Sequence, residues 1–352
     1  MVEKLALGLI SLLLLVDSQH RLFSVALTIS RRPLQPFEGQ SCNTTTVSSG
    51  VCTKESQCDP AFLHFMKYHD FVEVCHQNAF EKVQCCQSFL DLCKTALNTS
   101  YHIYQGQHAK EGAFPHLARL GATTEDNTTK WYCGGNVISE KFLLTAAHCS
   151  RVRIAGFGCH DSLPCEQKIP IKEFVKHPSY KKSLKYHDIA LVHLEAAVRF
   201  GRRVLPICPY SKMEDLRSTQ DLLTAGWGQT EKYAESPQLM FGIVRTVAVS
   251  DCAERHQALP EILNRKLDRG VTDEMYCAIG EQGHNTSDFV DSCQGDSGGP
   301  LQMEYQGNVF LVGIVSTGHG CGSSLPALYT RVSYYFDWIN EKMTQLQQMA
   351  GV

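Results

Sequence analysis

Three short segments of the 352-residue chain carry side chains that together could perform nucleophilic catalysis. They read Thr-Ala-Ala-His148-Cys, His-Asp188-Ile-Ala-Leu and Gly-Asp-Ser297-Gly-Gly. A serine hydroxyl is a poor nucleophile at neutral pH unless a neighbouring base removes its proton, and histidine has a suitable pKa for that task. An aspartate can orient such a histidine. The glycines around Ser297 indicate a backbone that needs special φ values, so this serine is expected in a specialised loop.

The elements that would hold these segments are mostly short β-strands. Runs rich in β-branched and aromatic residues, separated by Gly, Pro, Asn and Asp, predict strands at 141–145, 189–194, 243–249 and 309–315. Apolar side chains then recur at helical spacing from Tyr335 to Met343, which predicts a docked C-terminal helix. The formal net charge of -3 excludes binding of nucleic acid through bulk positive charge.

In the order histidine, aspartate, serine, the three segments resemble the trypsin/chymotrypsin family of serine proteases, since other triad enzymes use other orders. The resemblance spans roughly residues 103 to 345. It implies two six-stranded antiparallel β-barrels with His148 as general base, Asp188 as its orienting partner and Ser297 as nucleophile. The backbone N–H groups of Gly295 and Ser297 would form the oxyanion hole. The chemistry needs no cofactor.

The same resemblance implies a primary specificity pocket with Asp291 at its base. A buried carboxylate favours a substrate cation, because an unpaired buried charge is costly. Cleavage after Arg or Lys is therefore expected, and the preference between the two stays open. The implied pocket walls are Ser316, Gly318 and Ala327. Ala327 departs from the glycine that is usual in trypsin-like members, and it would bring a methyl group into the pocket.

Proteases of this family begin as inactive precursors, and Ile103-Tyr-Gln-Gly resembles the N-terminus that activation creates. Cleavage between His102 and Ile103 would release an ammonium group that pairs with Asp296 beside the oxyanion loop. Since His102 is neither arginine nor lysine, a trypsin-like enzyme would not readily cut there, and a different upstream protease is implied. The alternative cut, after Lys110, would leave Glu111 as a poor inserting terminus.

The chain has 16 cysteines, a number typical of proteins that fold in an oxidising compartment. Seven of them fall between Cys42 and Cys93, and the adjacent pair Cys85-Cys86 makes this block resemble the clip domain of arthropod proteases. Spacing alone leaves 15 connectivities open for six cysteines. The pairs that the resemblances imply are Cys42–Cys85, Cys52–Cys75, Cys58–Cys86, Cys93–Cys208, Cys133–Cys149, Cys159–Cys165, Cys252–Cys277 and Cys293–Cys321. A zinc site is the rival interpretation of the block, but it has no Cys-x2-Cys pair.

We expect no metal site, although calcium binding by the 159–165 loop stays open. The apolar run from Leu5 to Val16 is too short to span a bilayer and is typical of a signal peptide. The expected parts are a signal peptide at 1–18, a leader at 19–41, a clip domain at 42–86, a linker with the activation site at 87–102 and a protease domain at 103–352. Secretion makes glycosylation plausible at the sequons of Asn43, Asn98, Asn127 and Asn285.

These features predict a secreted zymogen that becomes a serine endopeptidase, with no membrane span and no nucleic-acid partner. Resemblance to clip proteases of subgroup C implies an arthropod haemolymph cascade for Toll signalling or melanisation. The implied partners are an upstream activating protease, a downstream clip-protease zymogen and a serpin inhibitor. Two alternatives stay open, namely a non-catalytic clip homologue that acts as a cofactor and a digestive trypsin-like protease.

Overall fold

The structure is a computed structural model, and it describes two parts of the chain. The first consists of residues 41–42, 50–54, 74–77 and 82–86. The second is residues 107–350, apart from 127, 162–163, 214–215, 217–219, 231–232, 234, 261–264, 283–287, 306–307 and 319. The expected signal peptide, the leader apart from its last residue Ser41, the activation site and all four sequon asparagines lie outside these residues.

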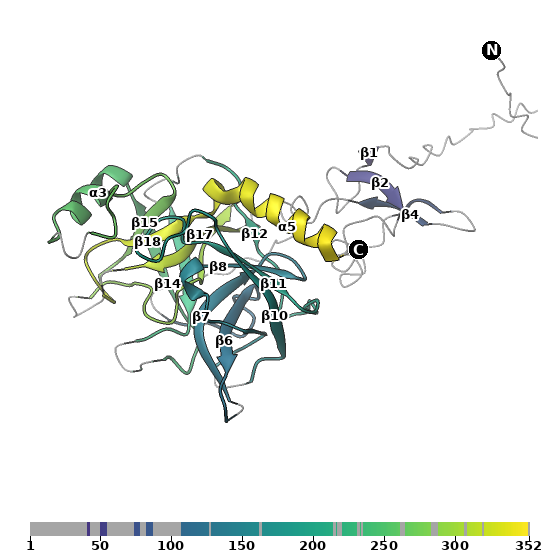
Figure 1. The fold of residues 1–352 in the computed structure, drawn as a ribbon, viewed down its shortest axis with the longest axis horizontal. Helices are drawn as coiled ribbons and strands as arrows, with labels where there is room; N and C mark the ends of the chain where they lie inside the picture. The colour runs from purple at the N-terminus through teal and green to yellow at the C-terminus, as the bar shows by residue number, and fades with distance from the viewer. Residues whose placement is uncertain are drawn as a thin grey trace, which may run out of the picture. The chain divides into compact units, whose positions relative to one another are not determined.

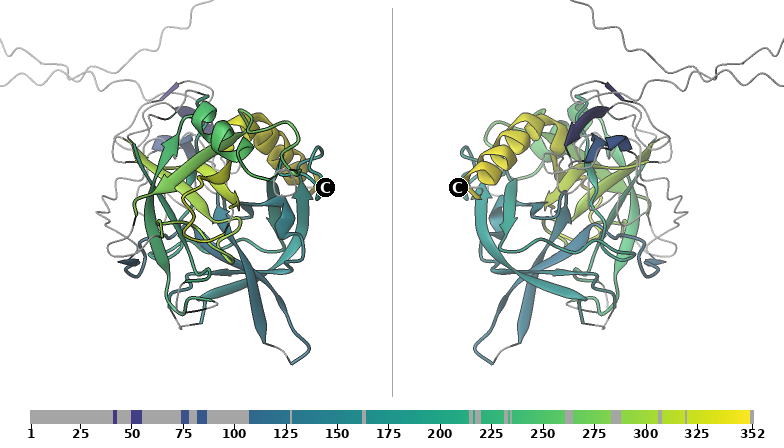
Figure 2. Two further views of the ribbon diagram at one scale, coloured as in Figure 1. Left: turned by 90° about the vertical axis from the view of Figure 1, so that its left-hand side faces the viewer. Right: turned by 90° about the vertical axis from the view of Figure 1, so that its right-hand side faces the viewer.

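A closed six-stranded barrel forms the first half of the larger part (Figures 1 and 2). Its strands pair antiparallel in the order β10-β11-β8-β7-β6-β9, and β9 pairs with β10 to close the ring. They are β6 (Leu117–Thr123), β7 (Thr129–Val137), β8 (Phe142–Thr145), β9 (Ile154–Phe157), β10 (Gln167–Lys176) and β11 (Ala190–Leu194). Strands β8 and β11 are buried along their whole length, as their apolar sequences predict.

The second half closes in the same way. The ring runs β16-β13-β14-β15-β18-β17, and β17 pairs with β16 to complete it. Its strands are β13 (Asp221–Gly226), β14 (Met240–Val247), β15 (Met275–Gly280), β16 (Pro300–Tyr305), β17 (Asn308–Thr317) and β18 (Ala327–Arg331). The short β5 (Gln107–His108) adds to β14, and β12 (Cys208–Pro209) runs parallel to β17.

Helices are few in the described residues. The predicted strand at 243–249 ends at Val247, because Val249 already begins helix α3 (Val249–Gln257). At the end of the chain, a 3-10 turn η3 (Val332–Tyr335) leads into α5 (Phe336–Ala350). The apolar face of α5 joins the core of the first barrel through Ile339, Met343 and Leu346. Two six-stranded antiparallel barrels with a C-terminal helix are therefore confirmed as the fold.

The cysteine-rich segment forms a small antiparallel sheet in the order β1-β2-β4-β3. Its strands are β1 (Ser41–Cys42), β2 (Gly50–Lys54), β3 (Val74–Gln77) and β4 (Lys82–Cys86). The backbone register places Cys52 opposite Cys85. Cys42 and Cys52 are buried and disulfide-bonded, while the cysteine side chains expected as their partners lie outside the described set.

Candidate active site

His148 stands at the rim of the first barrel, just after the buried strand β8. The chain leaves β8 through a 3-10 turn η2 (Ala147–Cys149), and Cys149 is bonded to Cys133 on β7. This disulfide anchors the turn to the barrel while the imidazole reaches the surface, with 34% of the side chain exposed. A rigid barrel end therefore carries an accessible histidine.

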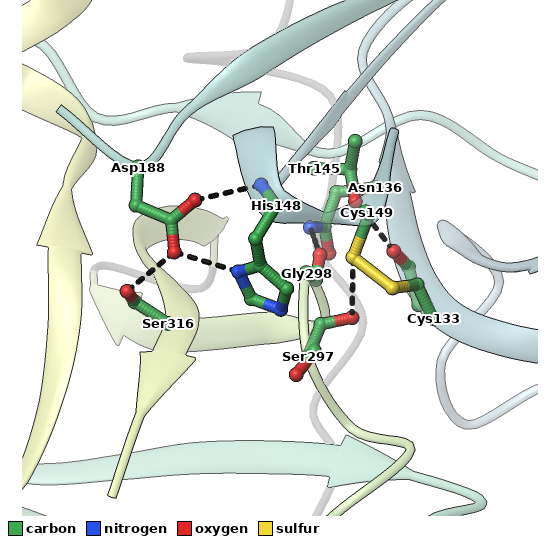
Figure 3. The surroundings of a disulfide bond; sticks show 10 residues. Cys133, Asn136, Thr145, His148, Cys149, Asp188, Ser297, Gly298 and Ser316 are labelled. Atoms are coloured by element: carbon green, nitrogen blue, oxygen red, sulfur yellow. Dashed lines mark hydrogen bonds and ion pairs between the residues drawn. A yellow bond between two sulfur atoms is a disulfide. The ribbon is translucent and has the colours of Figure 1, made fainter. Parts of the chain in front are cut away.

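Asp188 lies next to His148, because β11, which follows Asp188, pairs with β8, which precedes His148. Its Oδ2 is 2.7 Å from His148 Nδ1, and its Oδ1 accepts the backbone N–H of His148 at 3.0 Å (Figure 3). The carboxylate is buried, with 7% of the side chain exposed. Two contacts to one residue fix both the position of the histidine backbone and the orientation of its ring.

The second barrel supplies two further donors to Asp188. The hydroxyl of Ser316, on β17, donates to Oδ2 at 2.6 Å, and the hydroxyl of Thr330, on β18, donates to the backbone carbonyl of Asp188 at 2.9 Å. Ser316 is expected from the sequence in the wall of a pocket, and Thr330 has no signal there that marks it. Only the meeting of the two barrels shows that both side chains serve the aspartate.

The electrostatics of His148 suit a base that must hold a proton briefly. Burial disfavours the charged ring, but the hydrogen bond that the ring donates to Asp188 and the negative charge of Asp188 outweigh burial, so the pKa of His148 is raised. A raised pKa makes the imidazolium more stable, which favours uptake of a proton by His148. The ring lies between Asp188 and Ser297 in Figure 3.

The loop that carries Ser297 belongs to the second barrel but is held by the first. The carbonyl of Ser297 accepts the N–H of Gly134 at 2.8 Å, and the carbonyl of Gly298 accepts the side-chain amide of Asn136 at 2.9 Å. Gly298 has φ +80°, and a Cβ on it would lie 2.2 Å from Thr145 Oγ1. Glycine is thus required here both by conformation and by the close approach of β8.

Gly295 begins this loop with φ +102°, and a Cβ there would lie 2.9 Å from the Cα of Gly228. The neighbouring Asp296 is held under the loop, where it accepts the N–H groups of Gly228 at 2.7 Å and Cys293 at 2.9 Å. Burial outweighs these two donors and raises the pKa of Asp296 to about 6. The loop is therefore folded over a buried acid. His102 and Ile103 lie outside the described residues.

A cavity of about 580 Å³ lies beside the loop and is lined by both Asp291 and Asp296. Burial is the main cause that raises the pKa of Asp291 to about 7, and the negative charge of Asp296 adds to it. Two carboxylates share one cavity and each is costly to ionise there, so the cavity favours cationic groups.

The residues expected as pocket walls are placed differently from one another. Gly318 is exposed, and a Cβ on it would lie 4.0 Å from Asp291 Oδ2, so its backbone covers the carboxylate. Ala327 is buried within the core cluster of the second barrel, and none of Ser316, Gly318 and Ala327 is among the described residues that line the cavity.

Four disulfides have both side chains among those described. They are Cys133–Cys149, Cys159–Cys165, Cys252–Cys277 and Cys293–Cys321. Cys208 is buried beside β17, whereas Cys93 lies outside the described residues. The atoms of Cys133, His148 and Cys149 are close enough to hold a metal, but the two sulfurs are bonded to each other and are not thiolate ligands.

Comparisons with known proteins agree with this geometry. Residues 103–339 match the family described as Trypsin. The chain is 51% identical to CLIP domain-containing serine protease C9 of Anopheles gambiae, over 89% of this chain and 88% of that protein. It is 36% identical to serine protease snk of Drosophila melanogaster (68% and 56%) and 30% identical to phenoloxidase-activating factor 3 of Holotrichia diomphalia (86% and 94%). Within the described residues, no helix is both long and apolar enough to cross a bilayer.

The pKa of Asp291 leads to a pH-dependent affinity for cations. The carboxyl is neutral below about pH 7 and negative above it, so the affinity for p-aminobenzamidine should fall by roughly tenfold between pH 8 and pH 6. The fluorescence of this amidinium on binding measures the affinity at each pH. Asp291→Ser is the matched control and should bind weakly at both values. Equal affinity of the parent protein at pH 6 and pH 8 would contradict the assignment of Asp291 to the cation site.

Proposed function

The chain belongs to the clip-domain serine proteases of the trypsin family, and from this we propose that it is a secreted zymogen that becomes an endopeptidase cutting after arginine or lysine. The observation that carries the proposal is the 2.7 Å contact between His148 Nδ1 and the buried carboxylate of Asp188. That contact leaves the other ring nitrogen for the hydroxyl of Ser297.

The proposed reaction uses this arrangement twice. As the Ser297 oxygen forms a bond to the substrate carbonyl carbon, its proton passes to His148 Nε2, and the carbonyl oxygen takes the electron pair of the π bond. Asp188 stabilises the imidazolium through Nδ1. The N–H groups of Gly295 and Ser297 are the proposed donors to the oxyanion. When the carbon–nitrogen bond breaks, His148 returns the proton to the leaving amine, and water then repeats the sequence to release the acyl group.

Substrate choice is proposed to rest on Asp291. A guanidinium or ammonium group that enters the cavity would meet a carboxylate that has backbone donors but no ion pair among the described residues, and its pKa of about 7 would fall once the cation is bound. A neutral side chain would supply no charge to compensate that carboxylate. The described residues therefore support a preference for basic residues before the cleaved bond.

The place in a protease cascade is proposed from the proteins to which the chain is similar. One relative is named a phenoloxidase-activating factor, and the relatives include clip-domain proteases of insects. We propose that the active enzyme cleaves a downstream protease zymogen in haemolymph, in Toll signalling or melanisation, and that a serpin stops it. Extracellular location is supported by the disulfides, which persist in oxidising compartments.

Activation is proposed to occur at the His102–Ile103 bond. The buried Asp296 accepts two backbone N–H groups, yet its pKa is still raised to about 6, so the site lacks full compensation for a negative charge. The new ammonium group of Ile103 would supply the missing positive charge and stabilise the loop that contains Gly295.

Ser297→Ala should remove the nucleophile and lower peptidase activity by about 10⁴-fold or more, while leaving folding and activation cleavage intact. Hydrolysis of an arginine peptide by the cleaved variant and the cleaved parent measures the difference. Turnover by the variant within tenfold of the parent would exclude Ser297 as nucleophile. A parent that is fully cleaved but inactive would favour the cofactor role.

His102→Arg should make the zymogen activatable by trypsin, because it changes which protease can cut and leaves the new terminus at Ile103 the same. The intact parent treated with trypsin should stay inactive. The readout is hydrolysis of an arginine peptide after trypsin is inhibited, together with the N-terminal sequence of the large fragment. Activation of the parent at the same rate, with a fragment that begins at Ile103, would show that His102 does not control the step.

The cleaved protein should run as one band on a non-reducing gel and as two chains on a reducing gel, because a Cys93–Cys208 bridge is proposed to join the clip segment to the protease. Cys208→Ser should let the chains separate without reductant. Separation of the parent chains on a non-reducing gel would contradict this bridge.

A further inference from the structure

A second histidine–carboxylate pair, His187 and Glu274, adjoins the proposed triad at Asp188. His187 precedes Asp188, and it is one of two described non-glycine residues with a positive φ, at +55°. Its carbonyl accepts the N–H of Ile189 at 2.8 Å, so the chain turns tightly at Asp188. The direction in which Asp188 points therefore depends on the left-handed conformation of His187, which costs free energy for any residue with a Cβ.

Glu274 holds the side chain of His187 in this conformation. Glu274 Oε2 is 2.6 Å from His187 Nδ1, and only 4% of the Glu274 side chain is exposed. The hydroxyl of Tyr335 contacts the same two groups, at 2.9 Å from His187 Nδ1 and in a short hydrogen bond to Glu274 Oε2. Burial and the charge of Glu274 raise the pKa of Tyr335, so its hydroxyl remains a donor.

The remaining contacts of the pair make it rigid. Thr272 and Arg269 donate to the other oxygen of Glu274 at 3.1 and 3.3 Å. The ring of His177 stacks on His187, with centroids 5.1 Å apart, and meets Tyr335 edge to face. A carboxylate so deeply buried would be costly without its partners, so each contact that it makes resists movement of His187.

The three groups come from separate parts of the fold. His187 lies just before β11 of the first barrel, Glu274 just before β15 of the second, and Tyr335 in the turn that precedes α5. The pair therefore joins the two barrels through the residue that precedes Asp188. Together with Ser316 and Thr330, it fixes Asp188 relative to the barrel that carries Ser297.

We propose that His187 and Glu274 are positioning residues for the reaction, which keep the Asp188–His148 pair in register with Ser297 across the barrel interface. The proposal rests on the proposed peptidase function. Neither residue touches the reacting atoms, and their effect passes through the backbone at Asp188. Misplacement of a reacting group by about 1 Å can lower a rate by roughly a hundredfold, so a loose anchor should be visible in kcat.

The test compares truncation with conservative replacement at each position, in the His102→Arg background after trypsin cleavage. Glu274→Ala removes the anchor, while Glu274→Gln keeps an oxygen that can accept from His187. His187→Ala disfavours the left-handed conformation, whereas His187→Asn tolerates it. His193→Asn is the control, because His193 is also buried, on β11, and stacks on Phe142 without touching Asp188.

We expect Glu274→Ala and His187→Ala to lower kcat by about tenfold or more with KM unchanged. The conservative variants Glu274→Gln and His187→Asn should have kcat values between those of the alanine variants and the parent. Proton NMR of the intact chains gives a readout that needs no turnover. The low-field proton shared by His148 and Asp188 should shift in Glu274→Ala and stay in place in His193→Asn.

A Glu274→Ala enzyme with kcat within threefold of the parent, or a change confined to KM, would overturn the inference. If the alanine variants do not fold, the conservative variants carry the test, because they are expected to restore only part of kcat. Values of kcat for both Glu274→Gln and His187→Asn equal to that of His193→Asn would then overturn the inference. A parent without peptidase activity would contradict the proposed function alone, because the NMR measurement still tests the anchor.

Discussion

A carboxylate that is buried away from water requires hydrogen-bond donors, and in this protein the donors to the carboxylate of Asp188 come from both barrels. Asp188 is buried and receives hydrogen bonds from His148 in the first barrel and from Ser316 in the second. Its backbone carbonyl is bonded to Thr330 as well. A slip of one barrel against the other would leave a buried charge or a buried donor without its partner, which is a large free-energy cost.

The barrel interface is reinforced where backbone meets backbone. Around Ser297 the two barrels approach so closely that Gly298 and Gly134 have no room for side chains, because a Cβ on either residue would lie within 3 Å of an atom of the other barrel. Hydrogen bonds to the carbonyls of Ser297 and Gly298 then hold the loop from the first barrel. The loop of Ser297 is thus held at its main-chain carbonyls, by the backbone of Gly134 and the side-chain amide of Asn136.

Several strands and the C-terminal helix could be predicted from local patterns in the sequence, whereas the two-barrel architecture and the roles of the three candidate segments followed from their resemblance to a known family. What escaped prediction depends on residues far apart in the chain. The hydroxyl of Ser316 reaches Asp188, and Glu274 reaches His187, only after the barrels have assembled. A left-handed histidine likewise has no signature in sequence.

The docking of α5 has a consequence for how the first barrel completes its core. Ile339, Met343 and Leu346 belong to the same core cluster as first-barrel residues that begin at Ala118, so this core joins segments from opposite ends of the described protease region. Until α5 docks, apolar surface of the first barrel stays uncovered. A truncation before position 339 should therefore be read as a defect of the first barrel, although it removes none of that barrel's strands.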